Sequence, residues 1–394
     1  MSTKKDYIKM IRYSTLTSSF NYYYFIRVIV LFLLAKNVTP WVAVSVPIVL
    51  EFATLTSRSF TKVTEYAIKV NYKVYHIFYT VMFICLGLII ASCRNIYTIY
   101  LFTILLGLIK GIKNSSLTKL NTQNKEYEPF CFIEEERSSV IGGTLGLIIS
   151  QFVYDLSPRI YFFSFFILLI IETIFCFSLK EIPNEDIMEA MDKNKEIPQN
   201  EKNNIILATS LFAILAGLWC IGLGALTEIT PLITKKVGYI EASYTILESI
   251  LLFVISGKLL EKLKRKKKLL LSETIVALVD IIALLIASIT LSWQGLLVAY
   301  LLSAVTSTLG DPIWGSIMSA YSCGDRSKWI LVNKVYFIER GIFQVFTWLI
   351  CRKCVIRGIT SFKYLAVSLI VLLLITYVIA VSYTHLRAHE TGAY

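Results

Sequence analysis

The sequence predicts an all-α integral membrane protein with about twelve transmembrane helices in two pseudo-symmetric halves of six. Three observations predict this class: of 394 residues, 56% are hydrophobic, only 17% are charged, and the mean hydropathy is +0.66. A soluble domain carries about 25% charged residues. A membrane-spanning helix needs roughly 20 mostly apolar residues, and many stretches of that length follow one another here.

Twelve apolar segments can be drawn in order along the chain, each bounded by short polar stretches. A chain segment in lipid must satisfy its own backbone hydrogen bonds, so each segment is expected to be a helix. The longest polar interruption, 180–203, separates an N-terminal half, 1–179, from a C-terminal half, 204–381. The predicted spans are 14–36, 41–59, 74–93, 96–112, 138–156, 160–179, 204–226, 240–257, 269–291, 296–318, 331–351 and 362–381.

Both ends of the chain need separate treatment. The start is basic, and a long apolar span follows without a small-residue cleavage site, which favours a retained first helix over a cleaved signal peptide. The last residues, 382–394, resemble a translated sequencing-library adapter, and we set them aside as an artefactual tail. His76 is then the only histidine that remains.

The net charge of +12 lies between the apolar spans and not on one soluble face, which argues against nucleic acid as a partner. Successive polar segments alternate between the two sides of the membrane. The segments on the same side as the N-terminus hold 27 Lys and Arg residues, and those on the opposite side hold 9. Because cytoplasmic loops carry the excess of basic residues, we expect both termini and the 180–203 loop to be cytoplasmic.

Ionisable side chains inside the spans are candidates for function, because burying a charge in a membrane costs a few kcal/mol. A structural alternative is mutual neutralisation, for example of Arg27 by Glu51. Glu172 and Asp280 also fall inside spans. The candidates for binding substrate or protons are Arg27, Glu51, Glu248, Asp311, Glu339 and Arg340.

A polar segment after the eighth span carries a Gly, an acid and then a basic cluster, from Gly257 to Lys267. It resembles the signature between helices 8 and 9 of the major facilitator superfamily, and a poorer copy around Glu65 occupies the matching place in the first half. Asp311-Pro312, Asp325-Arg326 and Arg340 are similar to helices 10 and 11 of that family's bacterial drug-exporter-like members. The residues of the implied conformational switch are Gly257, Lys258, Glu261, Lys262 and Arg265.

This resemblance implies an alternating-access carrier in a bacterial plasma membrane, monomeric, without metal or cofactor and driven by a proton gradient. Helices 1, 4, 7 and 10 would line its cavity, and helices 2, 5, 8 and 11 would meet at the seam between the halves. We expect proton-coupled export of a small amphipathic or drug-like compound. A nutrient importer of the same fold, or a sensor or scaffold that no longer transports, are the alternatives.

Within that frame Glu248 is the first choice for a proton-coupling carboxyl, followed by Asp311 and Asp280, because its span carries no Lys or Arg and its helix is expected to border the cavity. Glu51 and Arg340 are expected to pair across the seam between the halves. Glu172 and Asp280 would lie on peripheral helices.

Other features carry less weight. Gly142 and Gly146 form a small-xxx-small face that predicts a close helix contact. Cys351 and Cys354 form a lone CxxC, which is too few ligands for a zinc site, and its role stays open. The chain has no Gly-rich phosphate loop and a single histidine before the tail, so no enzyme class is favoured.

Overall fold

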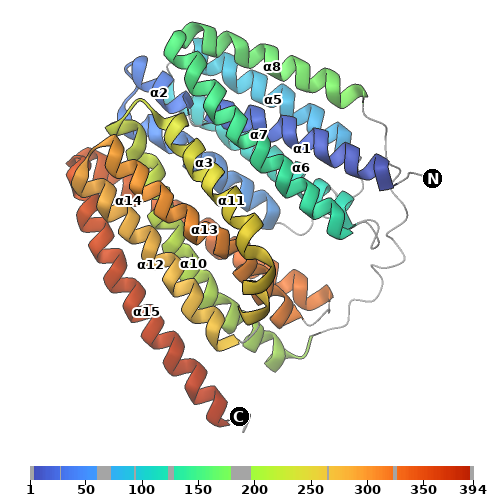
Figure 1. The fold of residues 1–394 in the computed structure, drawn as a ribbon, viewed down its shortest axis with the longest axis vertical. Helices are drawn as coiled ribbons and strands as arrows, with labels where there is room; N and C mark the ends of the chain where they lie inside the picture. The colour runs from blue at the N-terminus through green and yellow to red at the C-terminus, as the bar shows by residue number, and fades with distance from the viewer. Residues whose placement is uncertain are drawn as a thin grey trace. The chain divides into compact units, whose positions relative to one another are not determined.

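The structure, a computed structural model, describes residues 4–26, 28–59, 72–92, 95–122, 128–178, 197–263, 266–322 and 326–390. All regular structure in these ranges is helical (Figure 1). Two helices, α1 (Lys4–Ile26) and α2 (Val28–Ala35), form the first span, and each later predicted span corresponds to one helix. The predicted all-α fold of about twelve spans is confirmed.

The chain divides into two compact units, and the first contains Met1–Asn194 together with Thr234–Ile246. In this unit α1 packs along α7, α3 packs along α6, and α5 packs against both α6 and α8. Its further helices are α3 (Pro40–Ser59), α5 (Tyr72–Ser92), α6 (Ile96–Thr122), α7 (Glu128–Leu156) and α8 (Pro158–Ser178).

The second unit contains Lys195–Ile233 and Leu247–Tyr394. Here α12 packs against α10, α13 and α15, and α10 also packs along α14. Its elements are α10 (Gln199–Ile233), the later part of α11 (Val237–Leu263), α12 (Lys266–Thr290), α13 (Trp293–Ser322), α14 (Arg326–Arg357), a short 3-10 helix (Ile359–Ser361) and α15 (Phe362–Glu390).

Close helix contact explains the glycines of α7. A Cβ atom added at Gly142 would overlap the backbone carbonyl oxygen of Leu16, and one at Gly146 would overlap that of Phe20. Only glycine lets the backbones of α1 and α7 approach this closely. The predicted small-residue contact is confirmed.

Large apolar side chains remain exposed on many helices. Phe163, Ile174 and Phe177 on α8, and Val378 on α15, are each more than half exposed. Contiguous apolar surface of this kind is rare on soluble proteins but is expected where helices face lipid. In the described residues, nine helical segments are long and apolar enough to cross a membrane.

Several helices extend beyond their predicted spans, and one prediction is corrected as a result. α6 continues to Thr122, α10 begins at Gln199, inside the predicted 180–203 loop, and α11 continues to Leu263. Gly257, Lys258, Glu261 and Lys262 lie in the last turns of α11 and not in a loop, and their switch role remains a prediction. Lys and Glu are good helix formers, so the helix does not stop where the apolar stretch stops.

Some predicted features lie outside the described residues: Arg27, Arg265, the Glu65 copy of the motif, most of the 180–203 loop and the last four residues of the tail.

Candidate functional site

A polar cavity of about 220 Å³ lies among the helices of the first unit. Side chains from α1, α3, α5, α6 and α7 line it, so the site is built from one unit alone. The described lining residues are Thr15, Ser18, Ser19, Tyr22, Tyr23, Arg58, Tyr79, Lys110, Lys113, Asn114, Glu135 and Ser139.

Lys110 is one of three cations in the cavity wall. Its Nζ lies 3.7 Å from the centre of the Tyr22 ring and 3.5 Å from a carboxylate oxygen of Glu51. An ammonium over an aromatic face is stabilised by the ring's quadrupole. The predicted site residue Glu51 is thus paired with a lysine of α6, a residue that was not among the sequence candidates.

Lys113 lies one helical turn further along α6 and is buried. Its ammonium donates to the hydroxyl of Ser18 and lies 4.3 Å from the centre of the Tyr79 ring. It also lies within electrostatic range of His76 and Glu172. Lys113 therefore connects the cavity to a deeper group of charged side chains.

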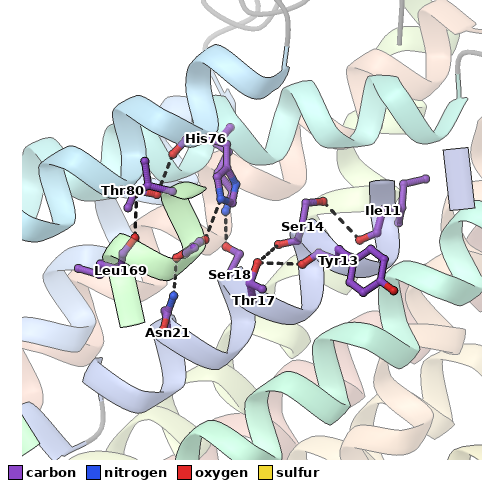
Figure 2. A network of polar contacts seen from close by, with 12 residues as sticks. Ile11, Tyr13, Ser14, Thr17, Ser18, Asn21, His76, Thr80 and Leu169 are labelled. Carbon is purple, nitrogen blue, oxygen red and sulfur yellow. Dashed lines mark hydrogen bonds and ion pairs between the residues drawn. The ribbon is translucent and has the colours of Figure 1, made fainter. Parts of the chain in front are cut away.

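That deeper group is a buried pair between His76 of α5 and Glu172 of α8. The His76 Nε2 lies 2.8 Å from one Glu172 oxygen, and the two side chains are 1% and 0% exposed. Asn21 Nδ2 of α1 donates to the other oxygen at 2.6 Å. Figure 2 shows His76 close to Asn21 and Ser18 of α1. Three helices are joined through one carboxylate.

Sequence reasoning missed this pair for identifiable reasons. His76 lies in the second turn of α5, which begins at Tyr72. The sequence predicts that Glu172 lies on a peripheral helix, but its side chain is buried in the interior of the unit. The signal was the cost of burying a carboxylate in a membrane, which requires a partner.

Two carboxylates of the second unit face a set of hydroxyl groups on α13. Glu248 accepts a hydrogen bond from Ser307 at 2.8 Å, and Asp280 accepts one from Thr306 at 3.2 Å. Asp280 is completely buried, and its Oδ1 has no hydrogen-bond donor among the described residues. Glu248, the preferred coupling residue, and Asp280 thus belong to one polar cluster, and Asp280 is an interior residue of its unit.

The two predicted site residues on α14, Glu339 and Arg340, contact different neighbours. Glu339 accepts a hydrogen bond from Ser210 of α10 at 2.5 Å. Arg340 contacts the hydroxyl of Tyr336 at 3.3 Å, and its guanidinium carbon lies 5.8 Å from the Trp219 ring centre. The predicted Glu51–Arg340 pair joins residues of different units and remains a prediction. The backbone of Asp311 is helical in α13, but its side chain lies outside the described set, as do those of the switch residues.

An ion pair links α1 to the first turns of α7, before the apolar span that begins at Arg137. Arg12 Nε lies 2.6 Å from a Glu134 oxygen. This hydrogen bond holds the pKa of Glu134 below its usual value, with burial opposing it. A depressed carboxyl pKa stabilises the folded state above the unfolded pKa, and the contribution is lost as pH falls through the folded pKa.

In the described part of the chain, no group of three or more His, Cys, Asp or Glu side chains is arranged to hold a metal ion. Cys351 and Cys354 are buried free thiols on α14.

Comparison with known proteins shows the fold. The chain matches no known family model and no curated protein sequence. It is similar to the crystal structure of a POT family transporter with a thioalcohol-conjugated peptide, with a TM-score of 0.76 and 14% identity over 95% of this chain and 96% of the other.

Two further structures give the same result. A POT family transporter in complex with 5-aminolevulinic acid has a TM-score of 0.69 and 14% identity, and the match covers 95% of this chain and 96% of that one. A bacterial homolog of the human lysosomal transporter Spinster, inward-facing and unoccupied, has a TM-score of 0.67 and 11% identity over 96% and 98%. The chain shares the fold of these three solved structures.

Proposed function

We propose that the chain is a secondary active carrier that moves a small solute across the membrane by alternating access, with a proton gradient as its energy source. The observation that carries this proposal is a polar, charged cavity within apolar helices of a transporter fold. Charged side chains inside a membrane are costly and commonly mark substrate or ion pathways. The favoured activity is export of an amphipathic or drug-like compound.

Proton coupling requires a carboxyl group that can gain and lose a proton inside the protein. Glu248 remains the first candidate, because it is half-buried and accepts a hydrogen bond from the Ser307 hydroxyl, which can also accept one. Asp311 and Asp280 follow it. The buried Glu172, which pairs with His76, joins them as a fourth candidate.

Import is the second candidate. One similar structure is described as a study of substrate recognition in proton-dependent oligopeptide transporters, and others hold a conjugated peptide or 5-aminolevulinic acid. Because identity is 14% or less in these three, the likeness supports neither direction by itself.

The proposed setting is a bacterial plasma membrane, with a monomeric carrier, both termini in the cytoplasm and the lipid bilayer as its solvent. The conformational switch would use the end of α11, where Glu261 could pair with a base in one access state and release it in the other.

Proton movement tests the proposal even while the solute is unidentified. Purified protein would be reconstituted into vesicles that contain a pH-sensitive dye, and pools of peptides, amino acids, organic acids and amphipathic drugs would be added outside. A solute-dependent pH change that a protonophore abolishes supports proton coupling, and its sign distinguishes symport from antiport. No pH change with any pool, in protein shown to be folded, would favour a sensor or scaffold.

A further inference from the structure

The wall of the first-unit cavity has a definite charge. Arg58 of α3 and Lys110 and Lys113 of α6 all line it, and Glu135 is the only carboxylate among its described lining residues. We propose that this cavity binds the anionic group of a small organic acid, a carboxylate or a phosphate monoester. The inference rests on the proposed carrier function and assigns its substrate class.

Lys110 has the geometry of an anion ligand. An ammonium group offers three N–H donors, and Lys110 uses a carboxylate 3.5 Å away and the face of Tyr22 as its contacts. Both contacts hold the ammonium in the wall of the cavity. A charge-assisted hydrogen bond from such a group is about twice as strong as a neutral one.

The rest of the wall suits the body of such a molecule. Tyr22 and Tyr23 contact each other edge to face with ring centres 5.2 Å apart, and Tyr79 lies beneath Lys113. Three serine hydroxyls, Ser18, Ser19 and Ser139, and the amide of Asn114 supply further polar contacts. Binding pockets for small molecules combine aromatic surface with a few polar groups of this kind.

A cationic solute fits this wall less well. It would approach three cations with one carboxylate in the lining, and like charges in a low-dielectric site repel strongly. The carboxylates of Glu51 and Glu172 interact with Lys110 and Lys113, but neither lines the cavity. The interior charges are therefore partly balanced while the surface that a solute meets is positive.

Direct binding tests this inference separately from transport. The full chain would be placed in nanodiscs of neutral lipid and titrated calorimetrically with benzoate, phenyl phosphate, benzyl alcohol and benzylamine, which share one ring and differ in charge. We expect benzoate or phenyl phosphate to bind and benzylamine not to bind. Lys110→Gln should weaken anion binding by about tenfold or more, because a charged donor is lost.

Two variants keep the test decisive. Lys110→Arg keeps the charge and should retain most of the affinity. Lys73→Gln removes a lysine of α5 that also lies over an aromatic ring, 5.9 Å from Phe177, but does not line the cavity. It should bind the anions as the parent does.

Stronger binding of benzylamine than of benzoate, or anion binding that is equal in Lys110→Gln and the parent, would overturn the site. Loss of anion binding in nanodiscs that contain anionic lipid would assign the site to a lipid headgroup and overturn the proposal of a soluble acid. Anion binding without any flux in vesicles would leave the site intact and contradict the carrier function. Flux of a cation without anion binding would support the carrier function and overturn the anion site.

Discussion

The carboxylate of Glu172 joins three helices, and the chemistry of the charges around it decides what a substitution does. His76 and Asn21 each contact a different oxygen of this carboxylate. Removing one member of a buried pair leaves the other without compensation, whereas replacing both with apolar residues of similar size is often tolerated.

We predict that Glu172→Ala destabilises the chain by about 3 kcal/mol or more, the cost of breaking a buried pair. The double variant His76→Phe with Glu172→Leu should be more stable than Glu172→Ala. Thermal unfolding in detergent, followed by the fluorescence of a thiol-reactive dye, measures both. A double variant that is no more stable than Glu172→Ala would contradict the pairing of the two side chains.

A second residue-scale prediction concerns proton coupling in the other unit. Glu248→Gln keeps the hydrogen bond with Ser307 but cannot carry a proton. The variant should retain downhill flux or exchange and lose accumulation driven by a pH gradient, as measured in vesicles with and without the gradient. Unchanged gradient-driven accumulation would remove Glu248 as the coupling residue, and Asp311 would be examined next.

At the residue scale the sequence identified the intramembrane acids but not their partners. The apolar composition of its span indicates that the charge of Glu51 needs a partner of opposite charge. That partner, Lys110, lies on another helix near the end of a predicted span. Such pairings depend on how helices are rotated about their axes, which apolar segments of uniform composition do not specify.

At the scale of a helix, hydropathy located every span but not its ends. It detects the part of a helix that lies in lipid, whereas the helix continues for as long as its residues favour it. α14 accordingly extends from Arg326 to Arg357, well beyond the predicted span 331–351.

The contact between α1 and α7 gives a prediction at this scale. Gly146→Ala would place a Cβ atom against the backbone carbonyl oxygen of Phe20, so it should separate the two helices and lower the yield of folded protein and its midpoint of thermal unfolding. Gly341→Ala is the matched control, because an added Cβ there has no neighbour within 4 Å. Size-exclusion chromatography and thermal unfolding would compare them, and equal behaviour of the two variants would contradict the close contact.

At the scale of the whole molecule, the class of fold followed from composition and the number of spans, since only helices and closed barrels cross membranes. The arrangement of the two halves relative to each other does not follow from the sequence in this way. An alternating-access carrier has more than one such arrangement, so no pattern in the sequence selects one.

The excess of basic residues predicts orientation in the membrane. A single cysteine at Asn194, in a variant without the native cysteines, should resist a membrane-impermeant maleimide added to intact cells and react after the cells are opened. Labelling in intact cells would invert the proposed topology.

The central claim is that this chain is a carrier, and counterflow tests it most directly. Vesicles containing the protein would be loaded with a high concentration of the unlabelled organic acid that binds best and diluted into a trace of the labelled acid. A carrier exchanges the two, so we predict that the labelled acid accumulates transiently above its outside concentration and that Lys110→Gln reduces this overshoot. Equilibration without an overshoot would indicate a channel, and the absence of uptake above protein-free vesicles would contradict transport.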